Sequence, residues 1–267
     1  MQKSFRTLSK YFRGWELQRN VIGALIYREL KTRVSEVRFG VVGVFIEPLG
    51  VMAVFLLIFS VIRGDRGPLD IALFLAAGIV LYTLFNEVAV RALNAMRANE
   101  ALFFYRPVKP IDAVIARGLV ESALFAIVYT VISAFIFAFR EEWILYDFPL
   151  LVISYVLLAL TAFGIGLLLM VAGHRYSSLV QIVPMAIRPL WFISGVFFSV
   201  VSLPQWIRPW LTWNPILQAI ELSRHAFSED YLLDKSISLP YLLACAGVSC
   251  CLGLWVYSNN ERILLTR

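Results

Sequence analysis

The fold is decided by the stretch FPLLVISYVLLALTAFGIGLLLMVA (148–172), whose twenty-five residues include no charged side chain. A helix of about 20 apolar residues is long enough to cross the hydrocarbon core of a bilayer. A single segment that crosses lipid must be helical, because lipid offers no hydrogen-bond partner to an exposed backbone. We therefore predict a transmembrane helix here and an all-helical membrane protein around it.

The composition of the whole chain also indicates a membrane protein. Of its 267 residues, 60% are apolar and only 16% are charged, with a mean hydropathy of +0.77, whereas a soluble domain has about 25% charged residues. A soluble enzyme, a disordered protein and a disulfide scaffold are therefore excluded. The three cysteines share one apolar stretch without a C-x-x-C spacing, and the two histidines lie far apart, so no metal site is predicted.

Six apolar runs are long enough to form transmembrane helices, which predicts one six-helix domain over 41–257. The predicted spans are 41–62, 69–90, 111–139, 148–172, 179–201 and 237–257. Residues 1–40 precede this domain, and 258–267 form a C-terminal tail. Of the 24 Lys and Arg residues, seventeen lie on the side of the two termini and six on the opposite side. This bias predicts a multi-pass protein whose two termini face the cytoplasm.

The segment before the first span contains a predicted amphipathic helix over 15–38. Its apolar residues recur every three to four positions with basic residues between them, namely Ile22, Ile26, Leu30, Val34 and Val37 against Arg19, Arg28, Lys31 and Arg38. This pattern is typical of a helix that lies in the membrane interface. A solvated helix that packs on a partner has the same pattern, so both interpretations stay open.

Two connections between the predicted spans have unusual sequences. The first, RALNAMRANEALFFYRPVKP (91–110), predicts a short helix that ends near Tyr105, since prolines disfavour helix in the residues before them. Its aromatic tip either binds a cytoplasmic partner or lies in the membrane interface. The second, 202–236, holds three of the seven tryptophans and is broken by prolines. It is either re-entrant or an interfacial aromatic belt.

Charged residues are rare inside the predicted spans. Arg117 and Glu121 lie four residues apart and can pair on one helical face. Arg188 lies in mid-span between Pro184 and Pro189. An arginine at that depth requires a partner, a cavity or an anionic ligand.

The sequence has neither a G-x-x-x-x-G-K-[ST] phosphate loop nor a G-x-S-x-G nucleophile turn. The chain is therefore predicted not to be an enzyme. Uphill transport by such a chain would draw on a separate subunit or on an ion gradient. An ion-driven carrier needs carboxylates at mid-membrane and inverted repeats, and the central parts of the spans offer almost no carboxylates.

Three segments resemble, in order, the permease subunits of type-2 ABC exporters, and most closely those of Gram-negative capsular-polysaccharide export. The family's interface helix and first span are similar to RELKTRVSEVRFGVVGVFIEPL (28–49). Its coupling helix resembles RANEALFFYRPVKPIDAVIARGLVE (97–121), and its external segment resembles LPQWIRPWLTWNPILQAIELSR (203–224). In the last of these, Asn214, Pro215 and Arg224 match the N-P…R pattern of these exporters.

The resemblance implies a half-transporter in the bacterial inner membrane, with a second copy of itself and two cytoplasmic ATPase subunits as partners. ATP and Mg²⁺ would bind those ATPases, and this chain would hold no cofactor. The external segment would form gate helices. The coupling segment would lie in a cleft of the ATPase through Glu100, Leu102, Phe103, Phe104, Tyr105 and Arg106.

The implied cargo is a lipid-linked acidic polysaccharide, passed to periplasmic and outer-membrane capsule export proteins, and nucleic acid is not among the partners. Aromatic faces bind sugars and arginines bind acidic groups. We therefore expect the cargo path to include Arg91, Arg97, Arg188, Trp191, Phe197, Phe198, Trp206, Trp210 and Trp213. Other lipid-linked glycans, such as O-antigen or teichoic acid, are alternative cargoes. A membrane-embedded enzyme acting on lipid-linked sugars is the alternative from a different class.

The substitution Phe104→Asp tests the coupling interpretation. A carboxylate in place of an apolar anchor leaves a charge buried in the ATPase cleft, so we expect the amount of co-purifying ATPase to fall roughly tenfold. Phe104→Leu keeps an apolar side chain and is the control. Equal co-purification of the Asp variant and the wild type would contradict the assignment.

Overall fold

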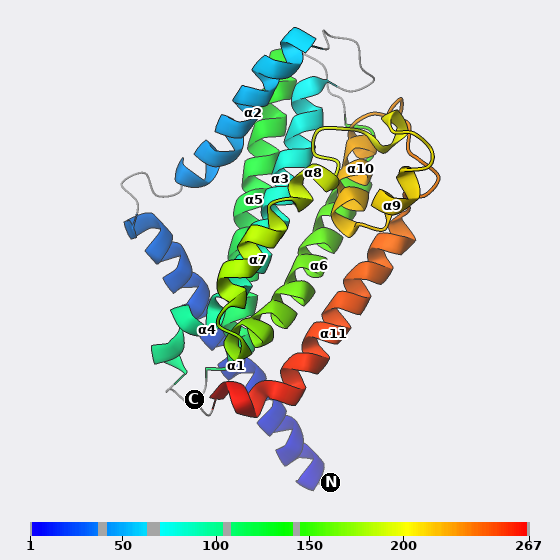
Figure 1. Ribbon diagram of the computed structural model, residues 1–267. Helices are drawn as coiled ribbons and strands as arrows, with labels where there is room; N and C mark the ends of the chain where they lie inside the picture. The colour runs from blue at the N-terminus through cyan, green and yellow to red at the C-terminus, as the bar shows by residue number, and fades with distance from the viewer. Residues whose placement is uncertain (1, 37–41, 63–69, 104–107, 141–144, 266–267) are drawn as a thin grey trace.

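The computed structural model describes residues 2–36, 42–62, 70–103, 108–140 and 145–265, and every regular element within these ranges is a helix (Figure 1). The predicted all-helical class is therefore confirmed. Within these described ranges, four helices are long and apolar enough to cross a membrane. They are α3 (Ile71–Leu93), α5 (Pro110–Arg140), α6 (Phe148–Arg175) and α11 (Leu239–Leu265). Each matches a predicted span, although α11 continues beyond the predicted end at 257.

Helix α3 lies at the centre of the bundle and packs against α5, α6 and α2 (Val42–Ile62). It begins after Asp70, whose carboxylate accepts hydrogen bonds from the backbone N–H groups of Ala72 at 2.7 Å and Leu73 at 3.4 Å. This is the usual way in which an N-cap pairs the first free N–H groups of a helix. Because most of its side chains are buried, α3 holds its neighbours in place.

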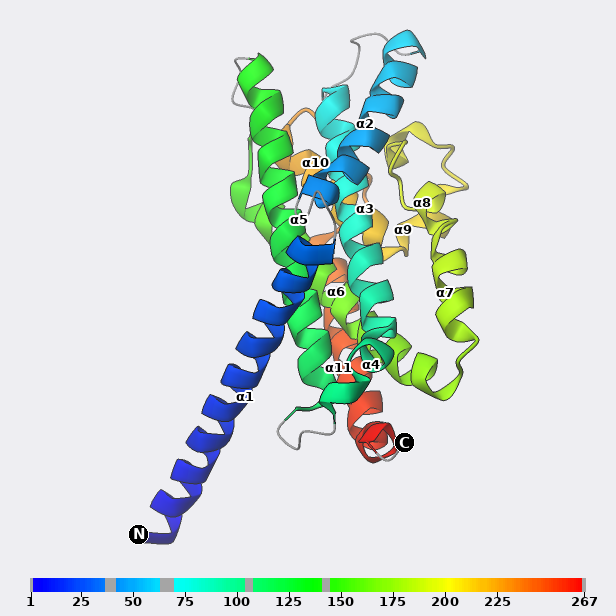
Figure 2. The same ribbon diagram turned by 90° about the vertical axis from the view of Figure 1, so that its left-hand side faces the viewer.

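The first residues of α1 and the last residues of α11 lie toward the same end of the bundle as the short helix α4 (Ala95–Ala98), which we call the terminal end (Figure 1). Helices α9 (Arg208–Thr212) and α10 (Pro215–Phe227) lie toward the other end, which we call the α10 end. Helix α1 (Gln2–Glu36) starts before the predicted 15–38 and extends away from the bundle at the terminal end (Figure 2).

The predicted fifth span, 179–201, is wrong as a continuous helix. The structure has two short helices there, α7 (Leu179–Ile187) and α8 (Leu190–Ile193), followed by a turn at Gly195 with a φ of 74°. Two prolines in this stretch have no N–H to donate, and glycine adopts a positive φ without strain. The interruption was visible in the sequence, but the apolar length of the segment outweighed it in the prediction.

The break between α7 and α8 is hydrogen-bonded to the central helix. The N–H of Trp191 donates to the carbonyl of Arg188 at 3.1 Å, three residues earlier, which leaves the carbonyl of Ile187 for another donor. The hydroxyl of Tyr82 on α3 donates to that carbonyl at 2.6 Å. A buried carbonyl without a partner is costly, so this hydroxyl allows the chain to break at this point.

Helices α6 and α11 cross at two glycines. A Cβ atom built on Gly164 would lie 2.3 Å from the backbone carbon of Ser249, and one on Gly253 would lie 2.5 Å from the carbonyl oxygen of Gly164. Both distances are shorter than a van der Waals contact, so only glycine fits at either position. Small residues at a helix crossing allow close backbone approach, which is a major source of helix association in membranes.

Gly253→Leu should separate α6 from α11, since the new side chain has no room at the crossing. We expect the free energy of unfolding to fall by about 1–3 kcal/mol. Gly247→Leu, on the same helix, is the matched control, because no described atom lies within 4 Å of a Cβ built there. The measurement is the thermal midpoint of each purified variant in detergent. Equal midpoints for the two variants would show that the crossing is not the constraint.

Candidate functional site

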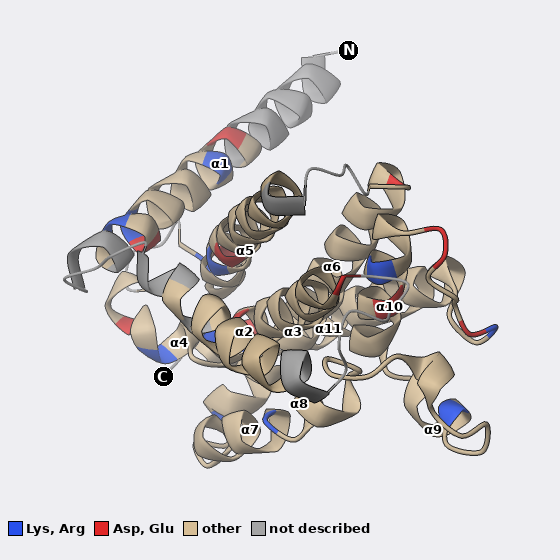
Figure 3. Ribbon diagram, turned by 90° about the horizontal axis from the view of Figure 1, so that it is seen from above, with Lys and Arg blue, Asp and Glu red and all other residues tan. Residues whose placement is uncertain are grey.

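Charged residues are sparse along the bundle and gather mainly in α1, near α4 and around α10 (Figure 3). Two polar sites result, one at each end.

The site at the α10 end is built on the N-P…R pattern. Asn214 caps α10 by accepting a hydrogen bond from the N–H of Ile216 at 3.0 Å, and its amide donates to the hydroxyl of Ser194 at 3.0 Å. Pro215 occupies the first helical position, where its missing N–H costs nothing.

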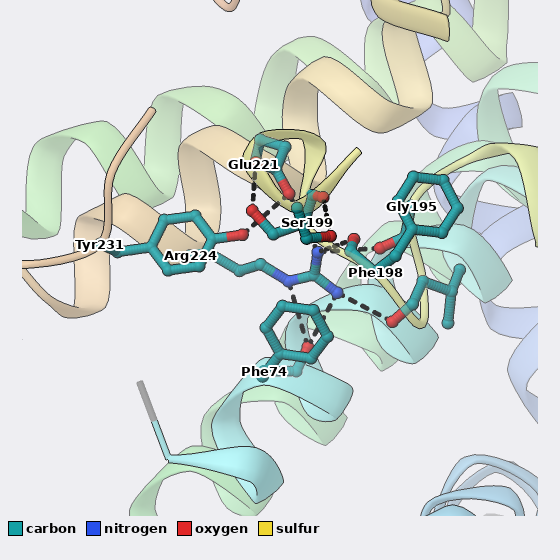
Figure 4. Close-up of polar contacts among 9 residues, drawn as sticks. Phe74, Gly195, Phe198, Ser199, Glu221, Arg224 and Tyr231 are labelled. Carbon is teal, nitrogen blue, oxygen red and sulfur yellow. Dashed lines mark hydrogen bonds and ion pairs between the residues drawn. The ribbon is translucent and has the colours of Figure 1, made fainter. Parts of the chain in front are cut away.

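Arg224 is the centre of this site, and its guanidinium is completely buried (Figure 4). Its Nη1 donates to the carbonyls of Gly195 at 2.8 Å and Phe198 at 3.1 Å. Its Nη2 donates to the carbonyl of Val196 at 2.8 Å, and Nε and Nη2 both donate to that of Phe74 at 3.3 and 3.2 Å. One side chain therefore ties α10 to the turn after α8 and to the start of α3.

The charge of Arg224 is balanced inside the site. Glu221 accepts from Nη1 of Arg224 at 3.1 Å and from the hydroxyl of Tyr231 at 2.9 Å, and the hydroxyl of Ser199 lies 3.5 Å from its second oxygen. The guanidinium also lies over the ring of Phe74, 3.4 Å from its centroid. A buried ion pair is tolerated only when its remaining hydrogen-bonding groups are satisfied, and these contacts satisfy them.

Gly78 allows the turn to approach α3 closely. A Cβ atom at Gly78 would lie 2.8 Å from the carbonyl oxygen of Val196 and 3.0 Å from Nη2 of Arg224. Any larger residue would therefore push the turn and the guanidinium away from the central helix.

The second polar site, at the terminal end, is an ion network that joins three helices. Arg91 on α3 pairs with Glu87 on the same helix and with the fully buried Glu121 on α5, both at 2.8 Å. Arg117 on α5 pairs with Glu29 on α1 at 3.5 Å and donates to the carbonyl of Arg91 at 3.0 Å. Arg117 and Glu121, which were predicted to pair on one face, thus each have a partner from another helix.

The predicted coupling segment lies beside this network. It consists of α4 and one 3₁₀ turn (Glu100–Leu102), with Asn99 buried between them. The amide of Asn99 donates to the carbonyl of Ala95 at 2.8 Å, and its oxygen accepts from Arg28 on α1. The segment is therefore fixed to α1 by a polar contact. Gln18, ten residues earlier on α1, donates to Asp112 at the start of α5 at 2.8 Å.

The predicted coupling residues are only partly described. Glu100 is exposed, Leu102 is half-buried, and Phe103 packs against an apolar cluster of the bundle. Phe104, Tyr105 and Arg106 lie outside the described residues. In the described part of the segment, the carboxylate of Glu100 thus faces the exterior and the ring of Phe103 faces the helical bundle.

The predicted path residues fall into three groups. Arg91 belongs to the ion network, and Arg97 is exposed near α4. Arg188 is exposed at the break between α7 and α8, and the nearby Trp191 and Phe197 form a cluster with Phe55 of α2. The distances between ring centroids in this cluster are 4.1–5.8 Å. Phe198 is half-buried, and its carbonyl binds Arg224.

The third group consists of Trp206, Trp210 and Trp213, which are 73%, 76% and 67% exposed. The segment that carries them is held rigidly by Arg208, which donates to the carbonyls of Val201 and Leu203 at 2.7 and 2.9 Å and pairs with Asp234 at 2.9 Å. The backbone N–H of Ser236 is the main group that lowers the pKa of Asp234, and Arg208 contributes. The tryptophans are therefore displayed on a fixed platform.

Several residues of both sites are absent from the sequence prediction, notably Glu221, Tyr231 and Glu29. Glu221 has a local signal, since it lies three residues before Arg224 on one helix. The pair of Glu87 with Arg91 has the same kind of signal, at a spacing of four residues. Neither Tyr231 nor Glu29 lies on the same helix as its partner, so no local pattern indicates either contact.

The long apolar helices of the described ranges define a helical membrane protein. The chain belongs to the ABC-2 type transporter family, whose sequence model matches residues 20–228. It is 34% identical over 254 residues to the polysialic acid transport protein KpsM of Escherichia coli. The aligned residues cover 95% of this chain and 98% of KpsM.

Two further relatives are capsule polysaccharide export inner-membrane proteins. CtrC of Neisseria meningitidis serogroup B is 28% identical over 93% of this chain and 95% of its own. BexB of Haemophilus influenzae is 27% identical, with an alignment that covers 92% of this chain and 93% of BexB. The resemblance inferred from the three sequence segments is therefore confirmed.

Arg224→Lys tests the arginine site. An ammonium group cannot reproduce the planar fork that reaches four carbonyls and a carboxylate, so some of these groups lose their donor. We expect a loss of about 2–4 kcal/mol in folding free energy, seen as a lower thermal midpoint in detergent. Arg188→Lys changes an exposed arginine in the same way and should leave the midpoint unchanged. A midpoint of Arg224→Lys equal to the wild type would refute this account of the site.

Proposed function

We propose that this chain is the membrane subunit of an ATP-driven exporter that moves lipid-linked capsular polysaccharide across the bacterial inner membrane. The observation that carries the proposal is the similarity to capsule export proteins over more than nine-tenths of the chain. ATP hydrolysis belongs to a separate cytoplasmic subunit, of which two serve a pair of permeases. The ion network and coupling segment support this assignment, because they form a firm anchor for force applied at the terminal end.

We further propose six membrane crossings with both termini in the cytoplasm. The four long helices supply the second, third, fourth and sixth crossings. Helix α2 supplies the first crossing, and the broken pair of α7 and α8 supplies the fifth. The side chains of Ile182, Met185 and Phe192 on this pair are exposed. A second copy that packs on this face and on α2 would cover them and place the cargo path between the two chains. The terminal end then faces the cytoplasm, and the tryptophan platform faces the periplasmic and outer-membrane partners.

The chemistry of the proposed path fits an acidic glycan. Arg188 supplies a charge-assisted hydrogen-bond donor at the break between α7 and α8, where its side chain is exposed. Trp191 and Phe197 supply aromatic faces beside it. Trp206, Trp210 and Trp213 offer a second aromatic surface where the glycan emerges.

Deletion of the gene in the source bacterium tests the function. If the chain exports the capsule, the polymer is made in full and accumulates inside the cell, and a plasmid copy of the gene restores it to the surface. Loss of polymer synthesis would favour a membrane enzyme that acts on lipid-linked sugars. Normal capsule with a different surface glycan retained inside would favour another lipid-linked cargo.

Arg188→Ala should reduce surface polymer roughly tenfold, the scale of one lost charge-assisted hydrogen bond, while the amount of chain in the membrane stays normal. Arg188→Lys retains the positive charge and should keep most of the export. Surface polymer is measured by antibody binding to whole cells, and the chain by immunoblot of membranes. Wild-type export by the Ala variant would remove Arg188 from the path.

A further inference from the structure

We infer that the hydrogen bond between Tyr129 on α5 and Ser223 on α10 passes the movement of the terminal end to the arginine site at the α10 end. This inference rests on the proposed function. It makes both residues positioning residues for transport, and it identifies α5 as a second link between the two polar sites, beside α3, which carries Arg91 at one end and Phe74 at the other.

Helix α5 is fixed to the coupling machinery at the terminal end. Its Arg117 pairs with α1, and its Glu121 pairs with Arg91 of α3. Helix α1 in turn holds the coupling segment through the contact of Arg28 with Asn99. A displacement of α4 by a bound ATPase therefore reaches α5 through ionic and hydrogen-bonded contacts that resist separation in a site of low dielectric.

The part of α5 between these contacts and Tyr129 is suited to carrying such a displacement. Tyr129 is the eighth residue after Glu121, which is about 12 Å along the helix. None of the intervening residues is glycine or proline, the usual sites of a helix kink. Because the helix does not bend easily here, its two ends move together.

The contact of α5 with α10 is a buried pair of hydroxyl groups. The oxygens of Tyr129 and Ser223 lie 2.6 Å apart, and both residues are buried, Ser223 completely. Breaking the bond in an apolar surrounding leaves two polar groups unpaired, so the bond favours movement of the two helices as one. Ser223 directly precedes Arg224, and any shift of its backbone acts on the guanidinium that holds Phe74 and the turn at Gly195.

A groove of about 510 Å³ lies beside this hydrogen bond, lined by side chains of α5 and α6, Tyr129 and Phe137 among them, and by Phe227 of α10. The rings of Tyr129 and Phe137 contact Phe227 edge-on, with centroids 5.9 and 6.0 Å away. Such contacts slide at little cost, whereas a hydrogen bond depends on direction. Helix α10 packs mainly on α6 and α3, and the hydroxyl pair is a directional contact that joins it to α5.

Tyr129→Phe and Ser223→Ala each remove one hydroxyl and retain the rest of the side chain. We expect each to lower surface polymer roughly three- to tenfold, while the purified complex with its ATPase still assembles and hydrolyses ATP at the wild-type rate. The double variant should export as much polymer as the single variant with the lower export, because both substitutions break the same bond and their losses do not add. A residue that merely supports the fold would lower assembly and hydrolysis together with export.

Tyr155→Phe is the matched control. Tyr155 on α6 donates to the carbonyl of Ser122 on α5 at 2.6 Å, so the variant also loses a hydroxyl that contacts α5 but leaves α10 untouched, and we expect normal export. Normal export by Tyr129→Phe and Ser223→Ala, additive losses in the double variant, or failure of both single variants to accumulate in the membrane would overturn the inference. If the wild-type chain has no ATPase partner, the proposed function fails instead.

Discussion

The complete pairing of the Arg224 guanidinium is the interaction on which the rest of the structure depends. A broken chain at membrane depth has carbonyls that no helix satisfies, and lipid cannot satisfy them either. Arg224 supplies five N–H donors to those carbonyls and to Glu221, and Glu221 neutralises the charge. One side chain therefore joins α10 to the interruption after α8 and to the start of α3. Gly78 and Gly195 provide the space and the turn that this arrangement needs.

The two polar sites divide the work of a transporter between the ends of the bundle. At the terminal end, carboxylates and arginines fix α1, α3 and α5 to one another beside the coupling segment. At the α10 end, the arginine site joins α10 to the turn after α8 and to α3. Directional polar contacts at both ends, joined by a stiff helix, provide a mechanical route that apolar packing alone does not.

Much of this architecture follows from the sequence, because apolar length and proline position are local properties. Four spans were predicted with small boundary errors, and the N-P…R pattern pointed to Asn214 and Arg224 before their contacts were known. The fifth span is wrong as one continuous helix because Pro184 and Pro189 interrupt an apolar segment of sufficient length. Glu87 and Glu221 lie within one helical turn of Arg91 and Arg224, but Glu121, Glu29 and Phe74 reach Arg91, Arg117 and Arg224 from segments that are distant in the chain, and no sequence pattern indicates them. Only the three-dimensional fold brings such groups together.

The central claim is that this chain transports by coupling to a separate ATPase. The most direct test is to purify the tagged chain from its native membrane and assay the preparation for ATP hydrolysis. The account predicts an ATPase subunit in roughly equal amount, with hydrolysis that requires both proteins. Purification of the chain alone, with no nucleotide-hydrolysing partner under conditions that preserve the membrane complex, would contradict the account.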